Sequence, residues 1–191
     1  MAKVKRGLIY LALVHYPVYN KHKKIVVTAV TNYDIHDISR ASATFNLDGY
    51  FIVTPLESQQ KLSRRIIDYW REGPGKELNY TRNESLLRTD IADSIEAVVS
   101  KIEEIHGKRP LLVGTSARLT RKNKRFIDFN DVEGIARKSP VLLLFGTGWG
   151  MDKRIIKECD HLLPPIKGPS EYNHLSVRSA VSIILDRIRG S

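Results

Sequence analysis

The segment VLLLFGTGWGM, residues Val141 to Met151, places five apolar residues directly before glycines at alternate positions. An apolar run of this length that ends in glycines is typical of a buried parallel strand followed by a loop. Glycines at a strand end let a ligand approach the backbone, because no Cβ atom stands in the way. The segment therefore predicts a strand at Val141–Phe145 and a ligand-contacting loop after it. A tight turn without a chemical role is the alternative for the same residues.

A second segment of the same kind lies further along the chain. Residues 161–163 are expected to form a short strand, the Pro- and Gly-rich residues 164–170 a turn, and Leu175–Ile188 a helix. Two strand ends followed by tight loops are typical of a small-molecule site at the carboxyl edge of a sheet.

The remaining sequence alternates between apolar runs and residues with helical periodicity. This alternation predicts an α/β fold with a mainly parallel sheet flanked by helices. Neither a repeat nor a linker interrupts it, so residues 1–191 are expected to form a single domain. Asp34 and Asp93 are expected to cap the first and third helices. The other expected strands are Leu8–Val14, Tyr50–Val53, Leu86–Arg88 and Leu111–Gly114, and Ile25–Val30 is expected to be a short extended piece. The other expected helices are Asp34–Phe45, Glu57–Arg71, Ser94–His106, Asn130–Lys138 and Met151–Glu158.

The chain is basic, with 31 Lys and Arg against 21 Asp and Glu and a net charge of +10. This balance favours an anionic partner such as nucleic acid. Cys159 is the single cysteine, which excludes an intrachain disulfide and predicts a reducing compartment such as the cytoplasm. No apolar run approaches the roughly 20 residues of a membrane span. The apolar run that follows the first few residues is interpreted as the first strand rather than as a targeting signal.

Several nucleotide and metal motifs are absent from the sequence. Residues 146–150 do not form the dinucleotide-binding pattern GxGxxG, because the third glycine falls one residue early. Neither GxxxxGK(S/T) nor GxSxG occurs, which disfavours a P-loop nucleotidase and an α/β hydrolase. The pattern HExxH and clusters of Cys and His are also missing, so no metal site is expected.

Two basic segments are candidates for phosphate contacts, the loop Arg118–Arg125 and the stretch Lys21–Lys24. A solvated charged surface without a partner is the alternative. The small and hydroxyl residues of Gly114–Arg118, which follow an expected strand, suit close approach to a polar ligand. The candidate RNA-binding residues are Arg118, Arg121, Lys122, Lys124 and Arg125.

Three segments, in order, resemble the motifs of the SPOUT class of RNA methyltransferases. Residues 34–46, DIHDISRASATFN, are similar to a first motif that reads roughly N-I-G-A-I-A-R-T-A-A-N-F-G, with Arg40 on its arginine and Asp34 on its asparagine. Residues 142–150 are similar to the motif L-V-F-G-x-E-x-x-G, with Thr147 and Gly148 in its acidic region. Residues 165–168 and 173–177 resemble P-M-x-G followed by S-L-N-V-S-V-A, with His174 where asparagine is common.

The resemblance covers most of the chain and implies the SPOUT alpha/beta-knot fold, in which the C-terminal segment forms a deep trefoil knot. Knots are nearly absent from other folds. The resemblance also implies a homodimer with the site near its interface. Within the class, the chain is similar to a small bacterial group of SAM-dependent RNA methyltransferases related to the C-terminal-like knot domain of the tRNA (guanine-N1) methyltransferase.

The function implied by the resemblance is transfer of a methyl group from S-adenosyl-L-methionine (SAM) to a base nitrogen or ribose 2′-hydroxyl of tRNA or rRNA. Arg40 is the candidate for stabilising negative charge or gripping a phosphate, and Asp34 is the candidate base. The expected SAM-binding residues are Thr115, Ser116, Ala117, Leu144, Phe145, Gly146, Thr147, Gly148, Gly150, Pro165, Ile166, Gly168, Asn173, His174, Leu175 and Ser176.

Three other functions fit parts of the same sequence. A non-catalytic RNA-binding α/β protein would have the same charge and fold but no cofactor. An enzyme that uses another nucleotide is disfavoured by the missing GxGxxG pattern. A SAM-dependent enzyme with a protein or small-molecule acceptor is disfavoured only mildly by the net charge.

Overall fold

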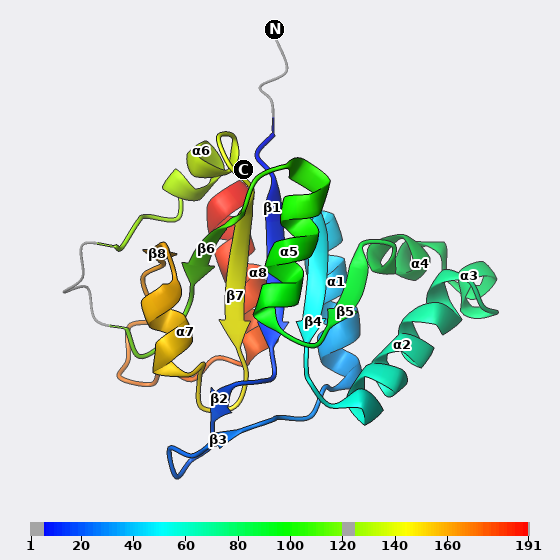
Figure 1. Ribbon diagram of the computed structural model, residues 1–191, viewed down its shortest axis with the longest axis horizontal. Helices are drawn as coiled ribbons and strands as arrows, with labels where there is room; N and C mark the ends of the chain where they lie inside the picture. The colour runs from blue at the N-terminus through cyan, green and yellow to red at the C-terminus, as the bar shows by residue number, and fades with distance from the viewer. Residues whose placement is uncertain (1–5, 120–124, 191) are drawn as a thin grey trace, which may run out of the picture.

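A parallel sheet forms the centre of the computed structural model, which describes residues 6–119 and 125–190. Within these residues the sheet has six strands in the order β5-β4-β1-β7-β6-β8, and every neighbouring pair is parallel (Figure 1). Two further short strands, β2 and β3, form a separate antiparallel hairpin. The prediction of a mainly parallel sheet flanked by helices is confirmed.

The bounds of the elements agree closely with the expected ones in the centre of the sheet. The strands are β1 (Ile9–Val14), β2 (Val18–Tyr19), β3 (Ile25–Val26), β4 (Gly49–Val53), β5 (Thr89–Ala92), β6 (Leu111–Gly114), β7 (Val141–Gly146) and β8 (His161–Leu162). The helices are α1 (Asn32–Thr44), α2 (Glu57–Arg71), α3 (Gly75–Leu78), α4 (Tyr80–Leu86), α5 (Ile95–His106), α6 (Asp131–Ala136), α7 (Lys153–Glu158) and α8 (Val177–Arg189).

Strand β1 lies between β4 and β7 and is buried along its whole length. Its side chains alternate between two apolar cores, because successive residues of a strand point to opposite faces. Leu11 and Leu13 pack on the side of α1 and α8, whereas Ala12 and Val14 pack on the side of α5 and α7. Burial on both faces explains why the central strands read as unbroken apolar runs in the sequence.

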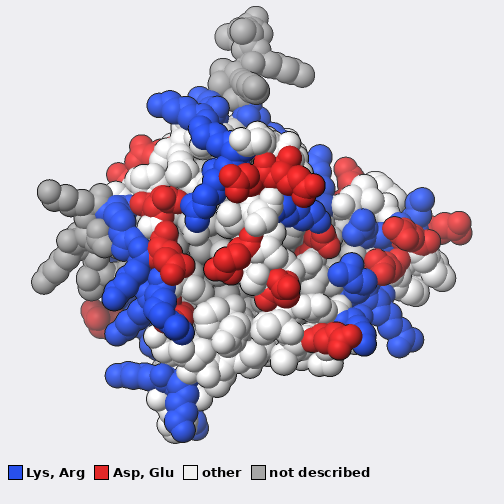
Figure 2. Space-filling model, viewed as in Figure 1, with Lys and Arg blue, Asp and Glu red and all other residues white. Residues whose placement is uncertain are grey.

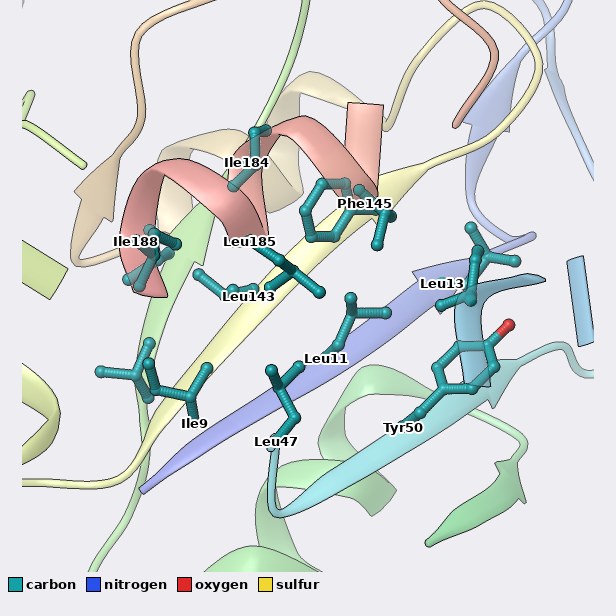
Figure 3. Close-up of a cluster of buried hydrophobic side chains, with 14 of the residues drawn as sticks. Ile9, Leu11, Leu13, Leu47, Tyr50, Leu143, Phe145, Ile184, Leu185 and Ile188 are labelled. Carbon is teal, nitrogen blue, oxygen red and sulfur yellow. The ribbon is translucent and has the colours of Figure 1, made fainter. Parts of the chain in front are cut away.

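Helix α8 closes the first of these cores. Ile184, Leu185 and Ile188 face Leu143 and Leu11 of the sheet (Figure 3). Replacing a leucine in such a position by alanine costs about 2–5 kcal/mol of stability. Arg189, near the end of α8, donates hydrogen bonds to the carbonyl oxygens of Gly7, Phe45 and Asn46, at 2.6, 3.1 and 2.6 Å, and so fastens the helix to the opposite end of the sheet from the candidate site.

The order of the strands creates a crevice at the carboxyl edge of the sheet. From β1 the chain proceeds to β4 and β5 on one side, and then β6, β7 and β8 fill the other side. The chain that leaves β1 continues to α1 on one face of the sheet, whereas the chain that leaves β7 continues to α7 on the other face. Such a switch in strand order is where parallel α/β sheets bind ligands.

The N-cap residues of two helices differ from the expected ones. Thr31, not Asp34, is the N-cap of α1, and Asp34 at the third helical position completes a capping box with it. Ser94, not Asp93, caps α5 by accepting a hydrogen bond from the amide of Ala97. In both places a neighbouring hydroxyl competes with the aspartate for the cap position. The expected stop of α5 at Gly107 is confirmed, since this residue is left-handed with φ 64°.

The expected strand at Leu86–Arg88 is wrong. Leu86 ends helix α4, where it is fully buried, and the strand begins at Thr89 to pair with β4. Helices α3 and α4 were not expected, because the Gly73-Pro74-Gly75 break conceals two short helices. Met151 lies before α7 in an isolated bridge to Val18, and Asp152 caps that helix. The C-terminal trefoil knot stays a prediction.

Candidate functional site

A cavity of about 490 Å³ lies at the carboxyl edge of the sheet. Its size is within the range of small-molecule and cofactor sites. The loops after β6, β7 and β8 border it, together with the start of α8 and residues from the segment 28–34. The two strand ends that the sequence singled out therefore converge on one hollow.

Most of the residues predicted to bind a cofactor line this cavity. Leu144 does not, because it is completely buried and packs in the core on the α5–α7 side of the sheet. Gly168 is exposed and also lies outside the lining. The predicted residues that do line the cavity are Thr115, Ser116, Ala117, Phe145, Gly146, Thr147, Gly148, Gly150, Pro165, Ile166, Asn173, His174, Leu175 and Ser176.

The glycine loop, residues 146–150, is held by main-chain hydrogen bonds to β2. The amide of Trp149 donates to the carbonyl of Tyr19 at 2.9 Å, and the amide of Tyr19 donates to the carbonyl of Gly150 at 2.8 Å. Gly148 and Gly150 have positive φ, 57° and 100°, which residues with a Cβ rarely adopt. The loop shape therefore depends on both its glycines and the hairpin beside it.

Gly146 is required for a different reason. A Cβ atom on Gly146 would stand 2.8 Å from the amide nitrogen of Met151 and 2.6 Å from its Cγ. Both distances are too short for real atoms, and one of them involves the backbone. Any larger residue at this position must therefore displace the loop.

A network of side-chain hydrogen bonds also supports the glycine loop, residues 146–150. The Thr147 hydroxyl donates to the carbonyl of Val14 at 3.0 Å and also bonds to the Thr28 hydroxyl. The Thr28 hydroxyl lies 3.1 Å from Nδ1 of His15. Burial lowers the pKa of His15 to about 4, although the negative charge of Asp34 raises it. His15 is therefore neutral at pH 7 and fully buried under the loop.

Asp34 lies at the cavity and is almost completely buried. One carboxylate oxygen accepts a hydrogen bond of 2.6 Å from the hydroxyl of Thr31. The other lies 3.3 Å from a guanidinium nitrogen of Arg178 on α8, and Arg178 also pairs with Asp37 at 3.3 Å. The carboxylate thus joins the starts of α1 and α8 at the cavity wall.

Arg40 lies outside the cavity. It is exposed on α1 and, within the described residues, no hydrogen bond or ion pair holds it. Asp37, three residues earlier on the same helix, pairs with Arg178. Arg40 lies six positions after Asp34 on the helix, a rise of about 9 Å. This chain by itself does not bring the two predicted catalytic residues together.

The predicted RNA-binding residues have separate locations. Arg118 lines the cavity, and its guanidinium carbon lies 5.1 Å from the ring centroid of Trp149. Arg125 donates two hydrogen bonds of 2.7 Å to the carbonyls of Lys157 and Cys159, which end α7. Arg121, Lys122 and Lys124 lie outside the described residues.

Several lining residues were missed by the sequence analysis. Thr28, Ala29 and Thr31 come from the segment before α1, and Trp149 lies between two predicted glycines. Only Trp149 carried a signal, a large aromatic residue between glycines. The cavity also gains Pro164, Val177, Ala180 and Ile184 from residues next to the third motif.

The described part of the chain shows neither a metal-binding cluster nor a membrane-spanning helix. It contains no group of three or more His, Cys, Asp or Glu that could hold a metal ion. None of its helices is long and apolar enough to cross a membrane.

A sequence model for a family described as SAM-dependent RNA methyltransferase matches residues 8–190. The chain belongs to this family. A protein of Oleidesulfovibrio alaskensis named tRNA (guanine-N(1)-)-methyltransferase is 43% identical over 182 residues, which cover 95% of this chain but 42% of the relative. This chain therefore spans less than half the length of that relative. An Aquifex aeolicus protein named only as uncharacterized is 39% identical over 94% of this chain and 87% of its own length.

The fold is that of the SpoU methyltransferases. The structure of AviRb from Streptomyces viridochromogenes, a SpoU methyltransferase solved with AdoMet, superposes with a TM-score of 0.59 at 16% identity, covering 97% of this chain and 58% of that one. The identity is low, so this likeness concerns the fold. The recognition of a SPOUT-class RNA methyltransferase from the three motifs is confirmed.

Proposed function

We propose that this chain transfers a methyl group from SAM to a nucleotide of tRNA. One observation carries the proposal: each of the three segments that resemble the SPOUT motifs contributes to the lining of one cavity at the carboxyl edge of the sheet, with Asp34 alone from the first segment. Membership of a SAM-dependent RNA methyltransferase family agrees with it. The name of the Oleidesulfovibrio relative favours tRNA as the acceptor.

The cavity suits the cofactor in size and lining. Phe145, Ile166 and Leu175 supply apolar walls for an adenine, and the small residues of 115–117 and 146–150 leave main-chain groups accessible for its hydrogen bonds. SAM, when bound there, supplies a methyl group that is already activated for transfer. The task of the protein is then to orient the acceptor in line with that methyl group and to exclude water.

Asp34 is the proposed proton acceptor, since its carboxylate borders the cavity. Thr31 and Arg178 fix the orientation of that carboxylate through the contacts described above. Arg178 also places a positive charge beside the cavity, where negative charge on the acceptor develops. Asp34→Asn should lower the methylation rate at least 100-fold and leave SAM affinity unchanged. If Asp34→Asn methylates RNA at the wild-type rate, Asp34 is not the proton acceptor.

The atom of tRNA that receives the methyl group can be measured directly. The name guanine-N(1) belongs to a relative more than twice as long as the matched region, so it does not by itself assign the atom methylated by this chain. Mass spectrometry of nucleosides from tRNA treated with this protein and SAM would identify a base nitrogen or a ribose 2′-hydroxyl. Calorimetry with SAM, followed by methyl transfer to total tRNA, tests the whole proposal. Absence of SAM binding would contradict it.

The RNA surface is proposed to extend over the β2–β3 hairpin and α7. Lys21, Lys23 and Lys24 are exposed at the hairpin tip, and α7 carries Lys153 and Lys157. Figure 2 shows these two elements as basic regions of the surface on one side of the molecule. Changing the three hairpin lysines to Gln should reduce the salt dependence of tRNA binding by about two to three phosphate contacts. Matched changes of Lys61, Arg64 and Arg65 on α2 serve as the control.

We also propose that the chain acts as a homodimer in the cytoplasm. Tyr33, Tyr172 and Leu175, near the cavity, are 69%, 74% and 47% exposed, which suits a surface covered by a second copy. Arg40 would then serve the cavity of the partner. A mixture of Arg40→Ala and Gly146→Val proteins tests this, because one composite site in the mixed dimer keeps both intact residues. Activity of the mixture should exceed that of either variant; equal inactivity would contradict a shared site.

A further inference from the structure

The mouth of the cavity carries an exposed aromatic ring that the proposed cofactor contacts do not use. Trp149 lines the cavity, yet it remains 49% exposed. Most side chains of this size are largely buried in folded proteins, because they carry a large apolar surface. An indole left half open at a ligand site therefore indicates a second ligand that covers it.

The backbone around Trp149 holds the ring in a defined place. Gly148 and Gly150 flank it with positive φ, and its amide is hydrogen-bonded to the carbonyl of Tyr19. The adjoining bridge between Val18 and Met151 extends this contact with the hairpin. The side chain is thus presented by a shaped loop rather than by a freely moving one, which reduces the entropy lost when a partner binds.

Arg118 determines which kind of ligand the ring can take. Its guanidinium carbon lies 5.1 Å from the Trp149 ring centroid, within the range of a cation–π contact. Both residues line the same cavity but come from different loops, after β6 and β7. A positive charge beside an aromatic ring favours a ligand that offers a π face near a phosphate. A nucleotide of RNA has both.

We infer that Trp149, with Arg118 stacked on it, is a platform at the cavity mouth for an unpaired nucleobase of the RNA acceptor. The inference rests on the proposed function for its acceptor and adds the substrate class. Indole and guanidinium planes stack on bases that are splayed out of a helix, and every base offers a π face. A base inside a duplex is already stacked on its neighbours, so the platform selects single-stranded or flipped-out nucleotides.

The test uses Trp149 as its own probe. The chain has two tryptophans, so a Trp70→Phe protein retains only Trp149 fluorescence. This protein is titrated with a synthetic single-stranded 12-nucleotide RNA of mixed sequence and with the same strand annealed to its complement. The single strand should quench Trp149 emission, and the duplex should quench it less and bind more weakly.

The matching variants are made in the wild-type chain. Trp149→Ala should lower affinity for the single strand about tenfold. Trp149→Phe, which keeps an aromatic ring, should recover part of this loss. SAM affinity by calorimetry should stay within about twofold in both variants. Tyr80→Ala, which removes an aromatic ring that is 77% exposed on α4, is the control and should leave RNA affinity unchanged.

Three results would overturn the inference. They are wild-type RNA affinity in Trp149→Ala, equal quenching by single strand and duplex, and a loss of SAM affinity that matches or exceeds the loss of RNA affinity. The last result would assign the ring to the cofactor. If the single strand quenches Trp149 but the wild-type protein methylates no RNA, the platform is supported and the proposed enzyme activity is contradicted.

Discussion

The two loops that carry the second and third motifs are built in different ways. Residues 147–152 donate main-chain hydrogen bonds to Val14, Tyr19 and Pro17, and the side chain of Thr147 bonds to Thr28. Residues 164–175, within the described part of the chain, make no main-chain hydrogen bond; the side chain of Asn173 joins them to the carbonyl of Ala117 at 3.1 Å. Hydrogen bonds to other segments therefore hold the first loop in place before a ligand binds, and we call it the preformed wall of the cavity. The second loop is held mainly by the rigidity of its prolines and by the cofactor that it would cover.

Replacement of Gly146 by valine should produce the largest effect. The added side chain would collide with the backbone at Met151, so the preformed wall must shift. We expect SAM affinity to fall at least 100-fold, measured by calorimetry, with a loss of about 1–3 kcal/mol of stability. Gly168→Ala in the second loop is the matched control, because a Cβ there meets no atom within 4 Å. Similar losses in both variants would contradict the contrast between the loops.

Acid should weaken the preformed wall through His15. Its pKa is about 4 in the folded protein and near 6.5 in the unfolded chain, so the unfolded chain binds more protons between these values. Stability therefore falls as the pH decreases through this window, by about 2 kcal/mol from pH 7 to pH 5. Urea unfolding at several pH values measures it. In His15→Gln this pH dependence should disappear; an unchanged slope would assign it to other groups.

Removal of the Thr147 hydroxyl should have a smaller effect on the same wall. Thr147→Val keeps the shape but leaves the Val14 carbonyl and the Thr28 hydroxyl without this partner. The expected cost is about 1–2 kcal/mol in thermal or urea unfolding. Thr147→Ser retains the hydroxyl and should stay close to wild type. If the serine variant loses as much as the valine variant, the methyl group and not the hydrogen bonds supports the loop.

Asn173→Ala should give the smallest effect and affect the second loop alone. It removes a partly exposed hydrogen bond to Ala117, worth about 0.5–1 kcal/mol. We expect a two- to fivefold loss of SAM affinity with no measurable change in unfolding. A stability loss as large as that of Thr147→Val would mean that the second loop is as firmly built as the first.

The sequence predicted best where burial dictates the pattern. Val141–Gly146 and Leu111–Gly114 are fully apolar because the sheet is covered on both faces, so their positions were evident. Helix α2 was also predicted with its observed bounds. The strand β5 was misplaced by three residues, because Leu86 and Leu87 look like a strand but belong to the end of a short helix.

The site was predicted less completely than the fold, for a physical reason. Its motif residues were recognisable, but the hairpin contacts of Tyr19 and Thr28 join residues more than a hundred positions apart in the chain. Contacts between residues so far apart produce no periodic pattern in the sequence, so they could not be predicted from it. Strand alternation explains the error at Leu144, which directly precedes the correctly placed Phe145 but faces the opposite core.

The position of α8 has a consequence for biosynthesis. Val177, Ala180 and Ile184 form part of the cavity, and this helix is the last of the elements that border it along the chain. A ribosome therefore makes the other walls first, and the growing polypeptide has no complete pocket until Ile184 has been added. Cofactor capture must follow translation of this helix, so SAM cannot act as a template for the earlier steps of folding.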